Sequence, residues 1–322
     1  MLIKALLSSL IASTVIAITA STTAMAQGPI SEVRGGTDTS SPRFEAVGTL
    51  GYLSGGEVND LAVRYRFFSE CTAVLISPTK VMTNAQCVTN SRGTKIKKGT
   101  FQVAFLKGAK KADIYLQDNI LLSATELQEA GVIIRNINPA TDVHVHPSFL
   151  EALSRNESGL YDSVRLAIID LQEPIDAIKP AKLADADFVD AMTTGTKVII
   201  AGYGHTGDDE KSAAQLQRAA LITMANDECD TIAASEGEGP IHAAQICAKS
   251  LNNNRSACNG DAGAPLFGLT DDGKIRLVGI HNFRWVTGSD SRCSRTLFDN
   301  FNMPARVSDW VENTLQLGTI LP

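Results

Sequence analysis

The sequence predicts an all-β protein, either a barrel or a sandwich, on three observations. Its periodic apolar segments are short, they are rich in β-branched residues, and turn-forming clusters separate them. The predicted strands cover residues 73–76, 101–106, 164–171, 197–201 and 276–280. The turn clusters include residues 55–56, 252–254 and 271–273, which are glycine, asparagine and aspartate.

One helical pattern stands out, at the C-terminal end of the chain. Val307, Trp310, Val311 and Leu315 fall on one face of a helix predicted over residues 303–315. Strand pattern lapses over residues 173–195, between two strand-rich halves. We therefore expect two lobes with a boundary in that stretch.

The first 26 residues are predicted to be a signal peptide. Lys4 precedes an apolar run over residues 5–20, and residues 24–26 (Ala-Met-Ala) form the small-x-small pattern that signal peptidase cleaves. A membrane anchor is the alternative, but the run is short for a span and no second long apolar segment follows. We expect an exported chain, secreted or periplasmic, with no membrane span and a short pro-like segment over residues 27–32.

Charge and cysteine content narrow the function class. The formal net charge is −6 and no large basic cluster occurs, so a nucleic-acid partner is not expected. Six cysteines in an exported chain predict three disulfides, although the count leaves their pairing open. A metal site is the weaker alternative because no Cys-x-x-Cys or Cys/His cluster occurs, and no cofactor is expected.

Two segments of the chain carry its clearest motifs, residues 71–87 (CTAVLISPTKVMTNAQC) and residues 256–266 (SACNGDAGAPL). Both are similar to signatures of the trypsin/chymotrypsin-like serine protease family. The first resembles the segment in which two linked cysteines bracket a strand pair and the catalytic histidine precedes the second. The second resembles the nucleophile loop Cys-x-Gly-Asp-Ser-Gly-Gly-Pro-Leu. Further matches follow in the family's order at residues 33–36, 145–149, 166–174, 201–204 and 246–248 and at the helix around Trp310.

The resemblance implies a fold and a disulfide pattern. The fold is two antiparallel β-barrels with a C-terminal helix, in a domain over residues 33–316. The barrels are expected at about 45–175 and 195–302 and the helix at 303–315. The implied disulfides are Cys71–Cys87, Cys229–Cys247 and Cys258–Cys293.

All three triad positions implied by the resemblance carry the wrong chemistry. The histidine position falls on Gln86, whose carboxamide is no general base near neutral pH. The nucleophile position falls on Ala262, which has no hydroxyl. The aspartate position falls on Arg165, a permanent cation, with Asp162 as the alternative carboxylate nearby.

Other parts of the family's site have counterparts. Gly260 and Ala262 occupy the oxyanion-hole positions, and Ser256 occupies the base of the specificity pocket. The expected pocket lining is completed by His281, Asn282, Phe283 and Arg284, of which Arg284 is expected to fill or cover the pocket.

The resemblance also assigns the two residues of the family's activation step, and three histidines offer alternative catalytic or metal-binding roles. Val33 and Asp261 correspond to the new N-terminus and the acid that pair in active family members, but Glu32 before Val33 is not a trypsin-type cleavage site. His281 is the one histidine expected near the cleft, either lining the pocket or serving as a relocated base. His144 and His146 form a possible metal pair without a third ligand.

The sequence therefore predicts a secreted serine protease homologue without peptidase activity, which acts by binding or regulation on a protein or peptide partner. Two alternatives stay open: a serine endopeptidase, and a structural or adhesive surface protein. The altered cleft is expected either to have drifted or to have been reused as a binding site.

Overall fold

The computed structural model describes residues 33–54, 58–59, 62–63, 66–89, 101–107, 129, 131–138, 141–155, 163–205, 216–235, 240–252, 254–287 and 293–317 of the 322-residue chain. The expected signal peptide and pro-like segment, the turn at residues 55–56 and Asp162 lie outside these residues. The description below concerns the compact unit that begins at Ser31.

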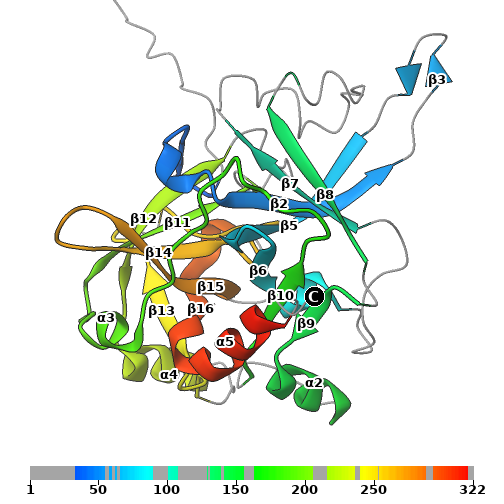
Figure 1. The fold of residues 1–322 in the computed structure, drawn as a ribbon. Helices are drawn as coiled ribbons and strands as arrows, with labels where there is room; N and C mark the ends of the chain where they lie inside the picture. The colour runs from blue at the N-terminus through cyan, green and yellow to red at the C-terminus, as the bar shows by residue number, and fades with distance from the viewer. Residues whose placement is uncertain are drawn as a thin grey trace, which may run out of the picture. The chain divides into compact units, whose positions relative to one another are not determined.

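Two seven-stranded antiparallel sheets form the fold, and Figure 1 shows them side by side. The first has the order β8-β7-β2-β5-β6-β10-β9. Its strands are β2 (Val47–Ser54), β5 (Arg66–Ser77), β6 (Lys80–Asn84), β7 (Phe101–Leu106), β8 (Val132–Ile137), β9 (Val143–Val145) and β10 (Leu166–Asp170).

The second sheet closes on itself. Its order is β1-β12-β11-β14-β15-β16-β13, and β12 also pairs with β13, which turns the six strands after β1 into a barrel. Its strands are β1 (Thr37–Asp38), β11 (Lys197–Gly202), β12 (Gln217–Thr223), β13 (Gln245–Lys249), β14 (Pro265–Leu269), β15 (Ile275–Val286) and β16 (Thr296–Asn302). The all-β prediction with two barrel-like sheets and a C-terminal helix is confirmed.

Apolar packing joins the two sheets. All five residues of β6 are buried. A strand that is covered on both faces lies inside the core. The largest buried apolar cluster contains residues of both sheets, including Leu75 and Met82 from the first and Phe267 and Leu277 from the second. The boundary between the barrels is therefore part of the core.

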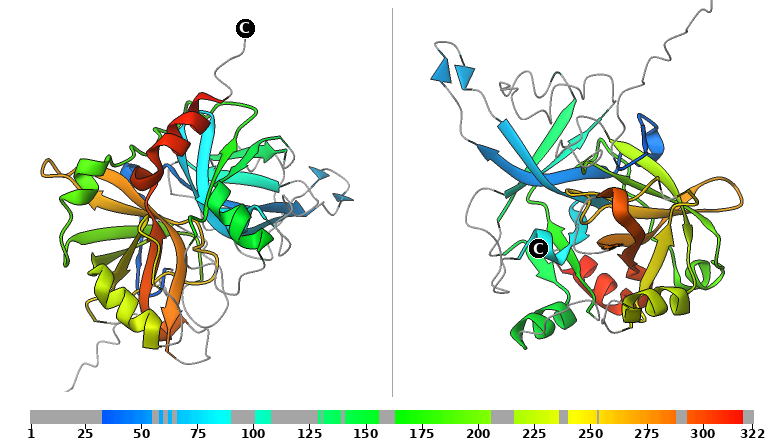
Figure 2. Two further views of the ribbon diagram at one scale, coloured as in Figure 1. Left: turned by 90° about the horizontal axis from the view of Figure 1, so that it is seen from below. Right: turned by 180° about the vertical axis from the view of Figure 1, so that it is seen from behind.

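The C-terminal helix differs in its start from the prediction. A 3-10 turn, η6 (Pro304–Val307), precedes the α-helix α5 (Ser308–Gln316). Pro304 has no N–H to donate and follows an extended residue, Met303, which favours a tight first turn. Val311 of α5 is buried in the cluster that joins the sheets, and Figure 2 shows α5 beside the first barrel.

Several elements were not predicted from the sequence. These are the helices α2 (Pro147–Ser154), α3 (Ala186–Asp190) and α4 (Asn226–Ser235). Helix α3 lies in the linker between the sheets, where the sequence predicted only a loss of strand pattern. β15 extends well past the predicted end at residue 280, because Asn282 and Arg284 interrupt the apolar pattern without ending the strand.

Three disulfides cross-link the fold, and they are the pairs that the family resemblance implied. The Cα–Cα distances are 6.1 Å for Cys71–Cys87, 6.6 Å for Cys229–Cys247 and 5.3 Å for Cys258–Cys293. The first bridge ties β5 to the turn after β6, and the third ties the loop before β14 to the segment before β16.

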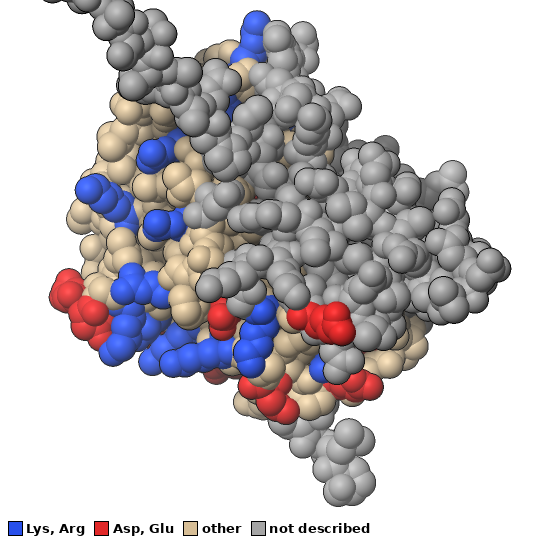
Figure 3. All heavy atoms as spheres, turned by 90° about the horizontal axis from the view of Figure 1, so that it is seen from above, with Lys and Arg blue, Asp and Glu red and all other residues tan. Residues whose placement is uncertain are grey.

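Two features of the described residues concern the predicted partners: the charges on the surface and the length of the helices. The face in Figure 3 carries lysine and arginine side chains along one edge, with aspartate and glutamate side chains nearby, so both signs of charge are present. Among the described residues, no helix is long and apolar enough to cross a membrane.

Candidate functional site

Four segments meet where the barrels adjoin. They are the short 3-10 turn η2 (Ala85–Cys87) after β6, the residue before β10, the loop before β14, and β15. The Ala85 N–H donates to the Arg165 carbonyl at 2.9 Å, and the Gly263 N–H donates to the His281 carbonyl at 3.0 Å. The Asn84 side chain donates to the His281 carbonyl at 3.1 Å and so links β6 to β15.

Thr72 holds the loop before β14 against the first barrel. Its N–H donates to the Ala262 carbonyl at 2.9 Å, and its hydroxyl donates to the Gly260 carbonyl at 3.1 Å. The same hydroxyl accepts the Tyr203 N–H at 3.1 Å, from the strand end in the second barrel. Thr72 therefore links the loop before β14 both to β5 and to Tyr203, the residue after β11.

Asp261 holds the loop from the inside and is fully buried. Its carboxylate accepts the Cys258 N–H at 2.8 Å and the Gly204 N–H at 2.9 Å. A β-carbon on Gly202 would lie 2.1 Å from Asp261 Oδ1, and one on Gly204 would lie 2.4 Å from its Cγ, so both positions require glycine. Burial raises the pKa of Asp261 to about 6, although the two N–H donors and nearby His281 oppose this.

The three residues that the resemblance assigns to the triad positions lie at this junction. Gln86 is exposed on η2, Ala262 is half-buried in the loop, and Arg165 is 4% exposed just before β10. The Arg165 guanidinium lies 5.7 Å from the centre of the Phe283 ring. None of the three side chains supplies a nucleophile or a proton acceptor.

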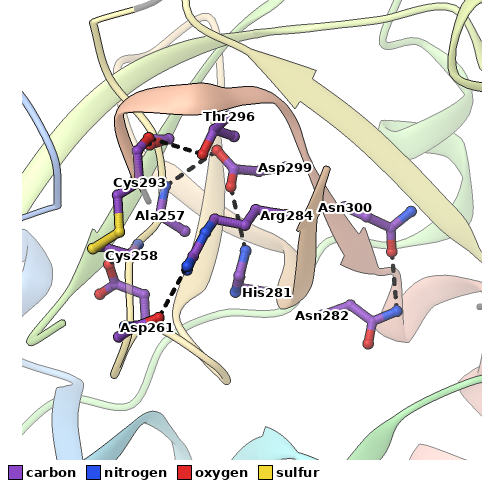
Figure 4. Close-up of polar contacts among 12 residues, drawn as sticks. Ala257, Cys258, Asp261, His281, Asn282, Arg284, Cys293, Thr296, Asp299 and Asn300 are labelled. Carbon is purple, nitrogen blue, oxygen red and sulfur yellow. Dashed lines mark hydrogen bonds and ion pairs between the residues drawn. A yellow bond between two sulfur atoms is a disulfide. The ribbon is translucent and has the colours of Figure 1, made fainter. Parts of the chain in front are cut away.

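A cavity of about 390 Å³ lies beside Ala262. It is lined by Cys258, Asn259, Gly260, Ala262, His281, Asn282, Phe283, Arg284 and Val286. Arg284 donates from Nη2 to Asn259 Oδ1 at 2.9 Å, and Figure 4 shows its side chain directed from β15 toward the loop of Cys258 and Asp261. Ser256 is not among the lining residues; it is buried and donates to the Cys293 carbonyl at 3.1 Å.

One of the lining residues, His281, forms a pair with Asp299 that the sequence did not suggest. His281 Nε2 is 3.4 Å from Asp299 Oδ1, and both side chains are almost fully buried (Figure 4). Asp299 also accepts the Ala257 N–H at 3.2 Å, and the His281 ring packs edge-on against Phe301 at 5.3 Å. The available signal was an acidic residue in the middle of the mostly buried strand β16.

The other four histidines lie outside the cavity lining. His144 Nε2 lies 3.1 Å from Asp170 Oδ2, while His146 bonds Ser148 and packs against Trp310. Burial is the main cause that lowers the pKa of His146. His144 and His146 thus have separate partners, and no group of three metal-ligating side chains occurs within the described residues.

Val33 lies in the core of the second barrel. It is fully buried with φ of 49°, and it packs in the apolar cluster that contains Val198 and Ile200. Arg34 beside it forms an antiparallel bridge with Ser256. The resemblance pairs Val33 with Asp261. The hydrogen bonds to the Asp261 carboxylate come instead from the N–H groups of Cys258 and Gly204.

The two sheets, the three bridges and the loop held by Asp261 define a double-barrel protein of the serine protease type. A family profile described as Trypsin matches residues 58–311, and this chain belongs to the trypsin family.

Curated relatives are consistent with that membership. The chain is 26% identical to human chymotrypsin-like elastase family member 3B, over 77% of this chain and 79% of the relative. It is 27% identical to the bovine suppressor of tumorigenicity 14 protein homolog, over 69% of this chain but 23% of that longer protein. It is 28% identical to the Drosophila melanogaster serine protease Hayan, over 68% of this chain and 32% of the relative.

The buried state of Asp261 predicts a pH effect on stability. Its folded pKa is raised from 3.8 to about 6, so the folded protein retains a proton that the unfolded chain releases in that window. The free energy of unfolding should therefore fall as pH rises through that window, by up to about 1.4 kcal/mol per pH unit from this group. The Asp261→Asn variant should lose this slope in urea unfolding measured at several pH values.

The matched control is Asp176→Asn, which removes an exposed carboxylate. It should keep the slope of the unaltered protein. Equal slopes in Asp261→Asn and the unaltered protein would show that Asp261 is not a buried acid.

Proposed function

We propose that this trypsin-family protein is exported, lacks peptidase activity and works by binding a protein or peptide partner. The observation that carries the proposal is the chemistry at the junction of the barrels, where Gln86, Arg165 and Ala262 stand at the triad positions. Acyl transfer by this fold needs a hydroxyl, an imidazole and a carboxylate in those places.

The remaining histidines do not supply a replacement base. His281 lines the cavity, yet its imidazole is buried beside Asp299, and no serine or cysteine thiol is among the lining residues. A base without a nucleophile does not restore acyl transfer, which argues against the serine endopeptidase alternative.

Export is supported by the three disulfides, since such bridges persist in oxidising compartments. The predicted signal peptide over residues 1–26 points the same way. A retained loop and cavity without catalytic groups favour binding over a purely structural or adhesive role, because concave sites are where ligands bind.

Purified protein should not react with a fluorophosphonate probe and should not hydrolyse casein. Loss of the nucleophile or the base alone costs about 10⁶-fold in a comparable enzyme, so turnover should lie below detection. The measurement is in-gel labelling with active trypsin as the positive control. Stoichiometric labelling of the purified protein would refute the proposal.

Restoring the triad should not by itself restore full activity. The first protein carries Gln86→His, Arg165→Asp and Ala262→Ser, and the second carries these changes and Arg284→Gly. Both also carry Glu32→Arg, which places a trypsin-type cleavage site before Val33. The second should show the higher kcat/KM on a mixed peptide library, because Arg284 spans from β15 to Asn259 across the cavity. Equal values would mean that Arg284 does not obstruct the cleft.

A further inference from the structure

The described residues that line the cavity beside Ala262 include a cation and no carboxylate. Nine of the residues that the structure describes line it, and the two of these that are ionisable are His281 and Arg284. No aspartate or glutamate is among these lining residues. Among the described lining residues, an anion would therefore find a guanidinium, Arg284, and no carboxylate.

Two backbone donors line the same cavity. The carbonyl oxygens of Gly260 and Ala262 are occupied by Thr72, but the N–H groups of these two residues donate to no group of the described chain. Gly260 adopts φ of 90°, a conformation that glycine tolerates. Two preorganised N–H groups on a fixed loop are suited to donate hydrogen bonds to an anionic oxygen.

Arg284 supplies the charge. One of its N–H groups holds Asn259 Oδ1 at 2.9 Å, and a guanidinium carries five donors in a planar fork, so it can bind Asn259 and a carboxylate together. The side chain is half-buried, which reduces solvent screening of its charge. A second cation, buried Arg165, lies over the ring of the lining residue Phe283 at 5.7 Å.

The nearby acids lie behind the wall and have their own partners. Asp299 lies 3.4 Å from His281 Nε2 and accepts the Ala257 N–H. Asp261 accepts two backbone N–H groups on the inner side of the loop. Neither residue is among the described residues that line the cavity, of which Arg284 carries a permanent positive charge.

We propose that this cavity binds a carboxylate of a peptide or protein partner, held by Arg284 and by the N–H groups of Gly260 and Ala262. Phe283, Val286 and the Cys258–Cys293 bridge supply an apolar wall for the carbon atoms that bear the carboxylate. The inference rests on the proposed binding function and specifies its ligand chemistry. The carboxylate is either an acidic side chain or a free C-terminus.

Calorimetric titration with five short acetylated peptides tests this and distinguishes the two sources. Ala-Ala-Glu amide is compared with Ala-Ala-Gln amide for the side chain, and Ala-Ala-Ala acid with its amide for the C-terminus. Ala-Ala-Lys amide serves as the opposite charge. We expect at least one carboxylate peptide to bind about 10- to 100-fold tighter than its amide match, the range of a charge-assisted hydrogen bond.

Two arginine variants locate the site. Arg284→Gln keeps a hydrogen-bonding side chain but removes the charge, and it should abolish the preference for the carboxylate. Arg276→Gln, on the same strand but outside the cavity lining, should keep it. In NMR spectra of the unaltered protein, the Gly260 and Ala262 amide protons should shift downfield on addition of the favoured peptide.

The proposal is overturned if acid and amide peptides bind equally, if none binds at millimolar concentration, or if the lysine peptide is preferred. A carboxylate preference that survives in Arg284→Gln, with the two amides unshifted, also overturns it by placing the anion elsewhere. Each of these results leaves the proposed function standing as long as fluorophosphonate labelling is negative. Positive labelling refutes the proposed function whatever the peptides show.

Discussion

The buried carboxylate of Asp261 is the constraint around which the rest of the site is arranged. A fully buried acid is costly unless donors face it, and the Cys258 and Gly204 N–H groups do so. Their positions fix the loop over residues 258–264 against the end of β11. Gly202 and Gly204 are required there because a β-carbon at either position would collide with the carboxylate. The loop in turn sets the position of Ala262 and the width of the cavity.

The shape of this loop and the acyl-transfer chemistry of the family therefore depend on different atoms. The shape depends on backbone groups, on Asp261 and on Thr72, which bonds the loop and Tyr203 together. The acyl-transfer chemistry of the family depends on three side chains that contribute little to that framework. At the positions that the family resemblance assigns to those side chains this chain has Gln86, Arg165 and Ala262, beside a loop whose Gly260 and Ala262 N–H groups donate to no group of the described chain. Under the proposed function, this framework binds a partner and does not cleave it.

The sequence predicted those parts of the site that short motifs encode. Residues 71–87 and 256–266 placed Gln86, Ala262, Asp261 and the Cys71–Cys87 bridge because each lies within a motif of fixed spacing. The pair of His281 and Asp299 was not predicted, since it joins two strands whose register no local pattern specifies. The true length of β15 was missed for a related reason, because polar residues that are buried by tertiary contacts break the apolar alternation.

Residue-resolved amide hydrogen exchange of the ligand-free protein tests most directly whether Asp261 holds this loop in place. The bonded amides of Gly204, Cys258, Gly263 and Ala264 should exchange slowly, while those of Gly260 and Ala262 should exchange fast. This contrast within a few neighbouring residues is what a rigid loop with two available donors predicts. Uniformly fast exchange over residues 258–264 would show that the loop is not held, and uniformly slow exchange would show that the two donors are already occupied.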